Sequence, residues 1–228
     1  MLLPVALSAC DSRPAPPASA PAGDPASQAA SAPAPAGAWG GSESCKRCHE
    51  EAYAEWKTSH HANALRDIVP DLDHEAFSPR REIRHGTQTS YADMRDGRLV
   101  LTTMGPDGKQ QDFEPIGVIG VDPLWQYLIP FPGDRLQVTE LAFDPAKKEW
   151  FNVYGAEDRQ YWEWGHWTQR GMNWNDMCAV CHTTSFQKGY RSSDDSYAST
   201  YLEKGVGCEQ CHGPMQAHND WQDQHPDQ

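Results

Sequence analysis

Three short cysteine–histidine motifs are the residues of this chain whose types and spacing could support chemistry. The pattern C-x-x-C-H occurs at residues 45–49, 178–182 and 208–212. Two thiols in this spacing can form thioethers with the vinyl groups of a haem, and the histidine that follows can reach the iron as proximal ligand. Six of the seven cysteines lie in these motifs, which predicts three covalently attached haem c groups. The predicted attachment residues are Cys45, Cys48, Cys178, Cys181, Cys208 and Cys211, and the predicted proximal ligands are His49, His182 and His212.

Two other kinds of cysteine site fit part of this pattern. A zinc site could use the second and third cysteine pairs, but the 26 residues between these pairs exceed the usual spacing of a zinc ribbon. Such a site would explain neither the three histidines nor the first pair. A thioredoxin-like redox site needs a single C-x-x-C pair, whereas this chain has three. Haem attachment accounts for all of them.

Composition and charge narrow the class of protein. The 228 residues allow one or two domains, and only 38% of them are hydrophobic. Haems would supply apolar bodies on which the nine tryptophans, eight tyrosines and six phenylalanines could pack. The formal net charge of −13 argues against nucleic acid as a partner and suits a basic redox partner, although acidity also serves solubility alone. No stretch approaches the roughly 20 apolar residues of a membrane-spanning helix.

The first 38 residues predict an anchor followed by a spacer. Residues 1–10 resemble the end of a bacterial lipoprotein signal, shortened and without its charged region, in which Leu7-Ser8-Ala9-Cys10 forms a lipobox and Cys10 is lipidated. Residues 11–38 are almost entirely Ala, Pro, Ser and Gly, a composition that stays unfolded and extended. At about 3.1 Å per residue this tether would reach on the order of 80 Å. The chain is therefore predicted to be extracytoplasmic, in a bacterial periplasm or at the cell surface, and held at a membrane.

Residues 39–228 predict an α+β domain packed around haems, with short helices and much irregular structure. Apolar spacing predicts a helix over 50–66, followed by a loop over 67–84. Alternating residues and the turns Asp96-Gly97 and Gly105-Pro106-Asp107-Gly108 predict a small antiparallel sheet over 86–155, inserted between the first and second motifs. The aromatic stretch 123–132 could pack on a haem or belong to an ordinary core. Residues 183–205 are expected to be a connector.

Several segments, in order along residues 39–221, give the chain a resemblance to the cytochrome c554-like multihaem cytochromes. They include the three motifs, Ser59-His60-His61-Ala62-Asn63-Ala64, Pro123-Leu124-Trp125-Gln126-Tyr127-Leu128 and His166-Trp167-Thr168. The resemblance is greatest to a branch that often carries tetratricopeptide repeats. It implies haems with two histidine ligands each, and position by position it implies His61, His166 and His218 as distal ligands. Members usually continue with a further C-x-x-C-H motif, which this chain lacks.

The other histidines and the methionines are weaker candidates for iron ligands. His60 competes directly with His61, and His85 is held in reserve. His74 and His225 are expected to face solvent. Methionine would raise the potential of its haem. The methionines that could replace a distal histidine are Met172, Met177 and Met215.

Three functions are compatible with these motifs. The first is electron transfer between redox proteins or subunits of a membrane complex, without catalysis of its own. The second is a haem enzyme with one open iron acting on nitrite- or hydroxylamine-type compounds, as in relatives of this broad superfamily. Some of these enzymes use C-x-x-C-K, whereas all three motifs here end in histidine. The third is a haem-bearing subunit that wires a larger assembly or filament. We predict the first, an electron-transfer protein rather than an enzyme.

Overall fold

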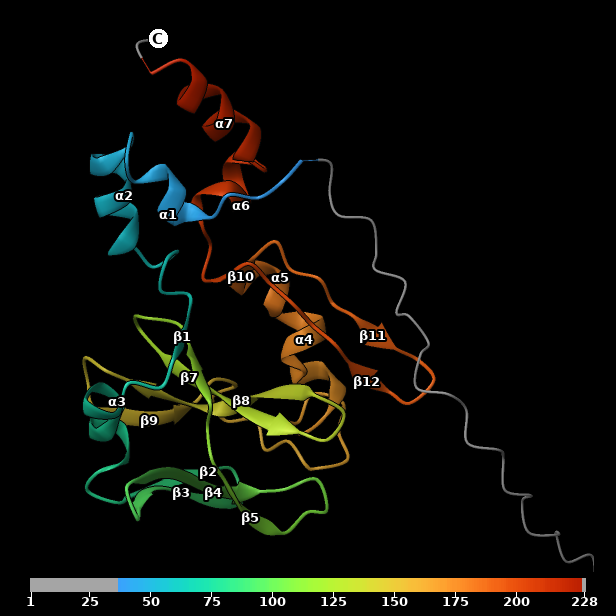
Figure 1. The fold of residues 1–228 in the computed structure, drawn as a ribbon. Coiled ribbons are helices and arrows are strands. Elements are labelled where there is room, and N and C mark those ends of the chain that lie inside the picture. Colours follow the sequence, from blue (N-terminus) through green and yellow to red (C-terminus); the bar gives the residue numbers. More distant parts are fainter. Residues whose placement is uncertain (1–36, 227–228) are drawn as a thin grey trace, which may run out of the picture. The chain divides into compact units, whose positions relative to one another are not determined.

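The computed structural model describes residues 37–226. The predicted lipidation site Cys10 and the predicted tether up to residue 36 lie outside this range. The described part mixes short helices with antiparallel strands (Figure 1), which agrees with the predicted α+β class. No helix within 37–226 has the length and apolar character needed to cross a bilayer.

Two antiparallel sheets form the part of the chain between the first and second motifs. The larger sheet has five strands in the order β1-β6-β7-β8-β9, and the smaller has four in the order β2-β3-β4-β5. The five-stranded sheet contains β1 (Leu65–Asp67), β6 (Gly117–Ile119), β7 (Trp125–Phe131), β8 (Arg135–Asp144) and β9 (Glu149–Asn152). The four-stranded sheet contains β2 (Arg81–His85), β3 (Gln88–Arg95), β4 (Arg98–Met104) and β5 (Gln110–Phe113).

The main hydrophobic core lies between these two sheets. Leu101 of β4 and Phe143 of β8 are fully buried in one cluster, together with Phe77 of α3 (Pro70–Phe77). The Phe77 ring packs edge-on against Tyr127 of β7, with ring centres 5.1 Å apart. This core needs no haem, because protein side chains fill it. Tyr127 belongs to the aromatic stretch 123–132, so that stretch is ordinary core at this position.

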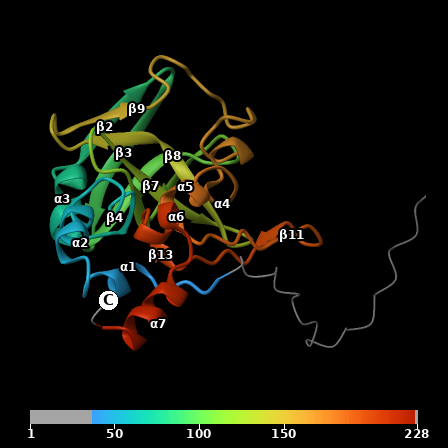
Figure 2. The same cartoon turned by 90° about the horizontal axis from the view of Figure 1, so that it is seen from above.

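Short helices carry the three motifs. The first motif runs from the end of α1 (Ser42–Cys45) to the start of α2 (Glu50–Lys57), and the third is α6 (Cys208–His212). The second begins at Cys178, directly after α4 (Trp174–Met177), and continues through α5 (Ala179–His182). Helix α7 (Gln216–Gln224) comes next, and α1, α6 and α7 lie close together in both views (Figures 1 and 2). The remaining elements are the 3-10 turn η1 (Arg170–Met172) and the short strands β10 (Thr183–Thr184), β11 (Tyr190–Arg191), β12 (Ser196–Tyr197) and β13 (Glu203–Lys204).

Four predicted elements differ from the structure. The helix predicted over 50–66 ends at Lys57, because turns follow and Leu65 begins β1 against Ile119. The loop predicted over 67–84 contains α3, which starts at Pro70, and most of β2. The β-rich region predicted as one small sheet forms two. The predicted connector 183–205 contains two short hairpin-like pairs, β10 with β13 and β11 with β12.

Candidate functional site

The first and third motifs line one apolar cavity. The cavity has a volume of about 450 Å³, within the range of ligand and cofactor sites. Its walls come from α1, α2, α6 and α7, so the two motifs face a common space although about 160 residues separate them in the sequence. Four histidines, four motif cysteines and several apolar side chains line it. They include Cys45, Cys48, His49, Tyr53, Trp56, His61, Cys208, Cys211, His212, Met215 and His218.

Two acidic side chains hold the two motifs together. Glu209, the residue after Cys208, is almost fully buried, and its carboxylate accepts hydrogen bonds from the backbone N–H groups of Gly40 (2.9 Å), Gly41 (2.7 Å) and Met215 (2.7 Å). Glu203 accepts from the hydroxyl of Ser42 at 2.8 Å, and that hydroxyl in turn accepts from the N–H of Cys208 at 2.9 Å. The segment before the first motif is therefore fixed directly to the third motif.

The four cavity histidines make no ring hydrogen bond within residues 37–226, a property that they share with the exposed His60 and His74. Ring hydrogen bonds in the range 37–226 are made by His85, His166, His182 and His225. The cavity rings are free to bind another group, and their imidazoles are suitable iron ligands. His49 and His218 are the closest such pair, with ring centres 6.5 Å apart and planes inclined by 25°.

The second motif is built on the five-stranded sheet rather than beside the cavity. Ala179 and Trp174 are buried against Leu128 and Val138 of that sheet. Burial raises the pKa of the Cys178 thiol to about 11, whereas Cys181 is exposed. Because this segment packs on the sheet, the two thiols and the imidazole of the second motif are held in a fixed orientation.

His182 makes a hydrogen bond that fixes its tautomer. Its Nδ1 lies 2.8 Å from the carbonyl oxygen of Ala64. A carbonyl oxygen only accepts, so Nδ1 carries the proton and Nε2 is left as the metal-binding nitrogen. A partner of this kind orients a histidine ligand and increases its basicity. The residues of the second motif therefore fit a covalently bound haem whose iron His182 binds through Nε2.

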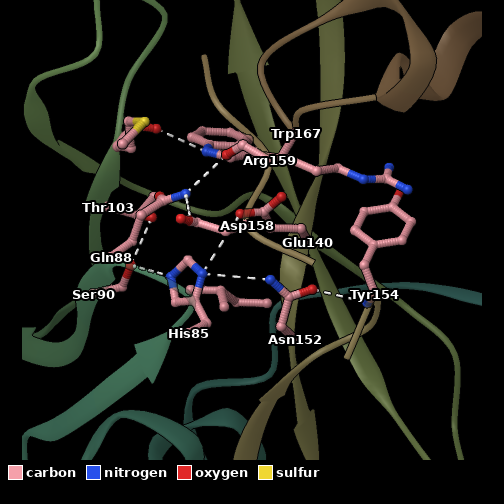
Figure 3. Close-up of polar contacts among 12 residues, drawn as sticks. His85, Gln88, Ser90, Thr103, Glu140, Asn152, Tyr154, Asp158, Arg159 and Trp167 are labelled. Carbon is pink, nitrogen blue, oxygen red and sulfur yellow. Dashed lines mark hydrogen bonds and ion pairs between the residues drawn. The ribbon is translucent and has the colours of Figure 1, made fainter. Parts of the chain in front are cut away.

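His85 belongs to a buried polar cluster between the sheets (Figure 3). Its Nε2 lies 3.0 Å from the Ser90 hydroxyl, and its Nδ1 lies 3.4 Å from the Asn152 amide nitrogen and 3.8 Å from a Glu140 carboxylate oxygen. Burial lowers the pKa of His85. Burial also raises the pKa of Glu140 to about 7. Both His85 nitrogens have polar neighbours in the protein, so this reserve candidate is a structural residue here.

His166 is fully buried, and one of its ring nitrogens has a polar neighbour whereas the other has none within residues 37–226. Its Nδ1 lies 2.9 Å from the Thr168 hydroxyl, and its Nε2 has no hydrogen-bond partner among the described residues. Burial lowers its pKa to about 4, which keeps the ring neutral. His166 is not among the residues that line the cavity of the first and third motifs. Its predicted role as a distal ligand stays a prediction.

The weaker candidates occupy varied positions. His60 and His74 are exposed, and His60 does not line the cavity that His61 lines. His225 stacks on Trp221, with ring centres 4.5 Å apart. The thioether of Met172 accepts a hydrogen bond from the Tyr154 hydroxyl at 2.6 Å. Met177 is exposed, and Met215 lines the cavity.

Three residues of the site make contacts that the sequence does not predict. Glu209 occupies a variable position of the motif, and Ala64 acts through its backbone carbonyl. Trp56, whose indole N–H donates to the Val206 carbonyl at 2.8 Å, connects α2 to the third motif. Their roles depend on contacts between segments more than 100 residues apart.

The zinc alternative has no support in the described residues. Within 37–226, no group of three or more His, Cys, Asp or Glu side chains converges as a bare metal-ion site requires. The six motif cysteines form no disulfide bond with one another. Since each pair is followed by a histidine, the donor set fits a haem at each motif better than a shared metal ion.

A comparison with known families agrees with this interpretation. Residues 44–91 and 154–213 match the family model for cytochrome c554 and c-prime. The matched segments contain all three motifs, His61 and His166, and they omit most of the β-rich region. No curated protein and no solved structure shows significant similarity to the chain. The match supports a cytochrome c with covalent haem and a haem-based role in electron transfer.

Proposed function

We propose that this protein is a c-type cytochrome with three haems, which relays single electrons between redox partners. The observation that carries the proposal is the cavity, where two C-x-x-C-H motifs and two further histidines face one apolar space. Bound haem iron would supply one-electron chemistry, and the protein would attach it, ligate it and limit its contact with water. The remaining haem belongs to the second motif.

His49 and His218 are the proposed axial ligands of the first haem. Because a histidine nitrogen binds a transition metal at about 2 Å, two imidazoles on opposite sides of one ion have ring centres roughly 6 Å apart. The observed separation of 6.5 Å meets this requirement. Helix α7 holds His218 in place, since Asn219 is buried and its amide donates to the Ser44 hydroxyl at 2.9 Å.

His212 and His61 are the proposed ligands of the third haem. Both line the cavity, and they are the two histidines that remain there after the first pair is assigned. The backbone of His61 is tied to the third motif, because its carbonyl accepts from the Val206 N–H at 2.8 Å. His60, the adjacent competitor, does not line the cavity. For the haem of the second motif we retain His182 as proximal ligand and His166 as the distal candidate.

The cellular setting is part of the same proposal. Covalent haem attachment and the lipobox-like sequence at Cys10 favour a lipid-anchored protein outside the cytoplasm. Its partners would be redox proteins or other subunits of a membrane complex. The charge of −13 favours partners with basic surfaces.

The test is a visible spectrum of the purified protein reduced with dithionite, with haem quantified per chain, before and after addition of carbon monoxide. We expect three haems per chain, all low-spin, and no spectral change with the gas, since every iron has two protein ligands. A haem fraction that is high-spin and binds carbon monoxide would overturn the relay and direct attention to nitrite and hydroxylamine assays. Fewer than three haems would overturn the count.

A further inference from the structure

We propose that Gly205 is a positioning residue that makes the loop at residues 61–64 a common support for two haem sites. The inference rests on the proposed function, because it concerns two of the ligands assigned above. The loop carries His61, the proposed distal ligand in the cavity. Its last residue, Ala64, accepts the hydrogen bond from His182 of the second motif. Each of these ligands therefore depends on where one short segment lies.

The backbone at Gly205 sits where the loop and both motifs meet. Its N–H donates to the His182 carbonyl at 3.0 Å, and the next residue, Val206, donates to the His61 carbonyl at 2.8 Å. Gly205 has a φ of +79°, in the left-handed region. A methyl group added here would lie 2.9 Å from the His61 carbonyl oxygen and closer still to that of Ala62. Only glycine allows this approach.

The loop is internally braced, so it should move as a unit. The Asn63 side-chain amide donates to the carbonyls of Ser59 (2.9 Å) and Lys57 (3.2 Å). The N–H of Ala62 donates to the Ser59 hydroxyl at 3.3 Å. On its far side, the Ala64 carbonyl accepts from the N–H of Gly120 at 3.2 Å. A displacement at Gly205 would therefore be transmitted to both His61 and Ala64.

The consequence is a linkage between ligands of different haems. Pushing the loop away from Gly205 would withdraw His61 from the cavity and lengthen the hydrogen bond from His182 Nδ1 to Ala64. Loss of that bond would make His182 a weaker electron donor to its iron, which would raise the reduction potential of the haem of the second motif. One backbone contact would thus control the coordination of one haem and the potential of another.

The experiment compares Gly205→Ala with Gly97→Ala in the full chain. Gly97 has almost the same φ, +77°, but a methyl group there meets nothing within 4 Å, so it controls for backbone strain alone. A third variant, His61→Ala, removes the ligand and leaves the loop in place. The readouts are the carbon monoxide-binding fraction and a spectroelectrochemical titration of all haems.

In Gly205→Ala we expect the haem that His61 ligates, one of three, to bind carbon monoxide. We also expect the reduction potential of the haem of the second motif to rise while that haem stays six-coordinate. His61→Ala should open one haem with a smaller effect on the second, and Gly97→Ala should match the wild type. The inference would be overturned if the two glycine variants gave the same carbon monoxide binding and the same potentials. It would also be overturned if Gly205→Ala opened one haem and left the potential of the haem of the second motif unchanged. If Gly205→Ala does not accumulate, Asn63→Ala can replace it and should show the same two changes with smaller magnitude. The absence of both changes in Asn63→Ala would overturn the inference. An open haem in the wild type would instead overturn the proposed function.

Discussion

Histidines in two regions of this molecule have opposite surroundings. In the cavity between the first and third motifs, the rings of His49 and His218 are exposed and face apolar walls. Between the two sheets, His85 is buried and both of its nitrogens have polar neighbours. The difference separates a histidine that the fold uses in its own polar network from histidines whose rings have no partner there. Residue type alone does not make this distinction.

The two regions should also differ in what stabilises them. The sheet region has a core filled by its own side chains, such as Phe77, Leu101 and Phe143. The cavity region is built from short helices, which gain little stability from their own hydrogen bonds. Because each attached haem would bring a large apolar surface to these walls, that region should depend on haem for folding.

The largest effect is expected from removing a haem from the cavity. Replacing Cys208 and Cys211 with Ala together should leave an unstable, protease-sensitive product at several-fold lower levels, because the cavity loses its apolar filling. Limited proteolysis and haem quantification measure this. Replacement of the same two residues by Ser should behave alike, which excludes an effect of alanine itself. A soluble, protease-resistant double variant with its other two haems intact would contradict the prediction.

The next effect is expected from removing one proposed ligand. His218→Ala should leave three attached haems but convert one of them to a form that binds carbon monoxide, because the iron loses its distal imidazole. Haem content and the carbon monoxide difference spectrum measure this.

His225→Ala is the matched control, since His225 follows the same helix but stacks on Trp221 outside the cavity. It should retain the wild-type spectrum. If both variants remained fully six-coordinate, His218 would not be the ligand, and Met215, which also lines the cavity, would be tested next.

In the sheet region, the pH dependence of stability should reveal Glu140. Its pKa is raised from 4.5 to about 7, chiefly by burial, with Arg159 opposing the shift and Asp158 adding to it. Between these values the folded state holds a proton that the unfolded chain has released. The free energy of unfolding should therefore fall as the pH rises from 4.5 to 7, by at most roughly 3 kcal/mol from this group.

Glu140→Gln removes that titration and should be more stable than the wild type at pH 8, with little difference at pH 4. Denaturant unfolding at both pH values measures this. Glu149→Gln, at an exposed position of β9, serves as the control and should keep the wild-type dependence. An equal stability of Glu140→Gln and wild type at pH 8 would mean that Glu140 is ionised in the fold without penalty.

The smallest effect is expected at the rim of the cavity. Arg47 forms an ion pair with Asp223 of α7, but both side chains are about half exposed. Exposed pairs contribute little and are screened by salt, so Arg47→Ala should lower the melting temperature by about 2 °C or less. Thermal unfolding at low and high salt measures this, and a large loss that persists in high salt would show that Arg47 packs rather than pairs.

The sequence predicted the class of the fold better than the bounds of its elements. The three motifs, the strands around Leu101 and Val138 and the α+β class were all evident from spacing and alternation. The helix over 50–66 was predicted too long because Leu65 continues the helical spacing, while pairing with Ile119 places it in a strand. The sequence does not predict the helix at Pro70, because proline usually interrupts regular structure, although it is favoured in a first helical turn.

The histidines show where sequence reasoning stops. His60 and His61 are adjacent, and only the folded chain shows that, of these two, His61 is the one that lines the cavity. The partner of His182 is a backbone carbonyl that any residue at position 64 would provide. Pairing of His49 with His218 joins residues about 170 positions apart. Such contacts arise from tertiary structure and leave no local pattern.

The bonds of Glu209 bear on how the protein is made. This carboxylate holds Gly40 and Gly41, although it lies 169 and 168 residues further along the chain, respectively. If the polypeptide is exported from its N-terminus, as the proposed location requires, the first motif would emerge long before the residue that fixes its position. The maturation machinery would therefore meet the first motif while it is still accessible. The cavity would close only when the third motif arrives, so assembly of this site would be the last step of biogenesis.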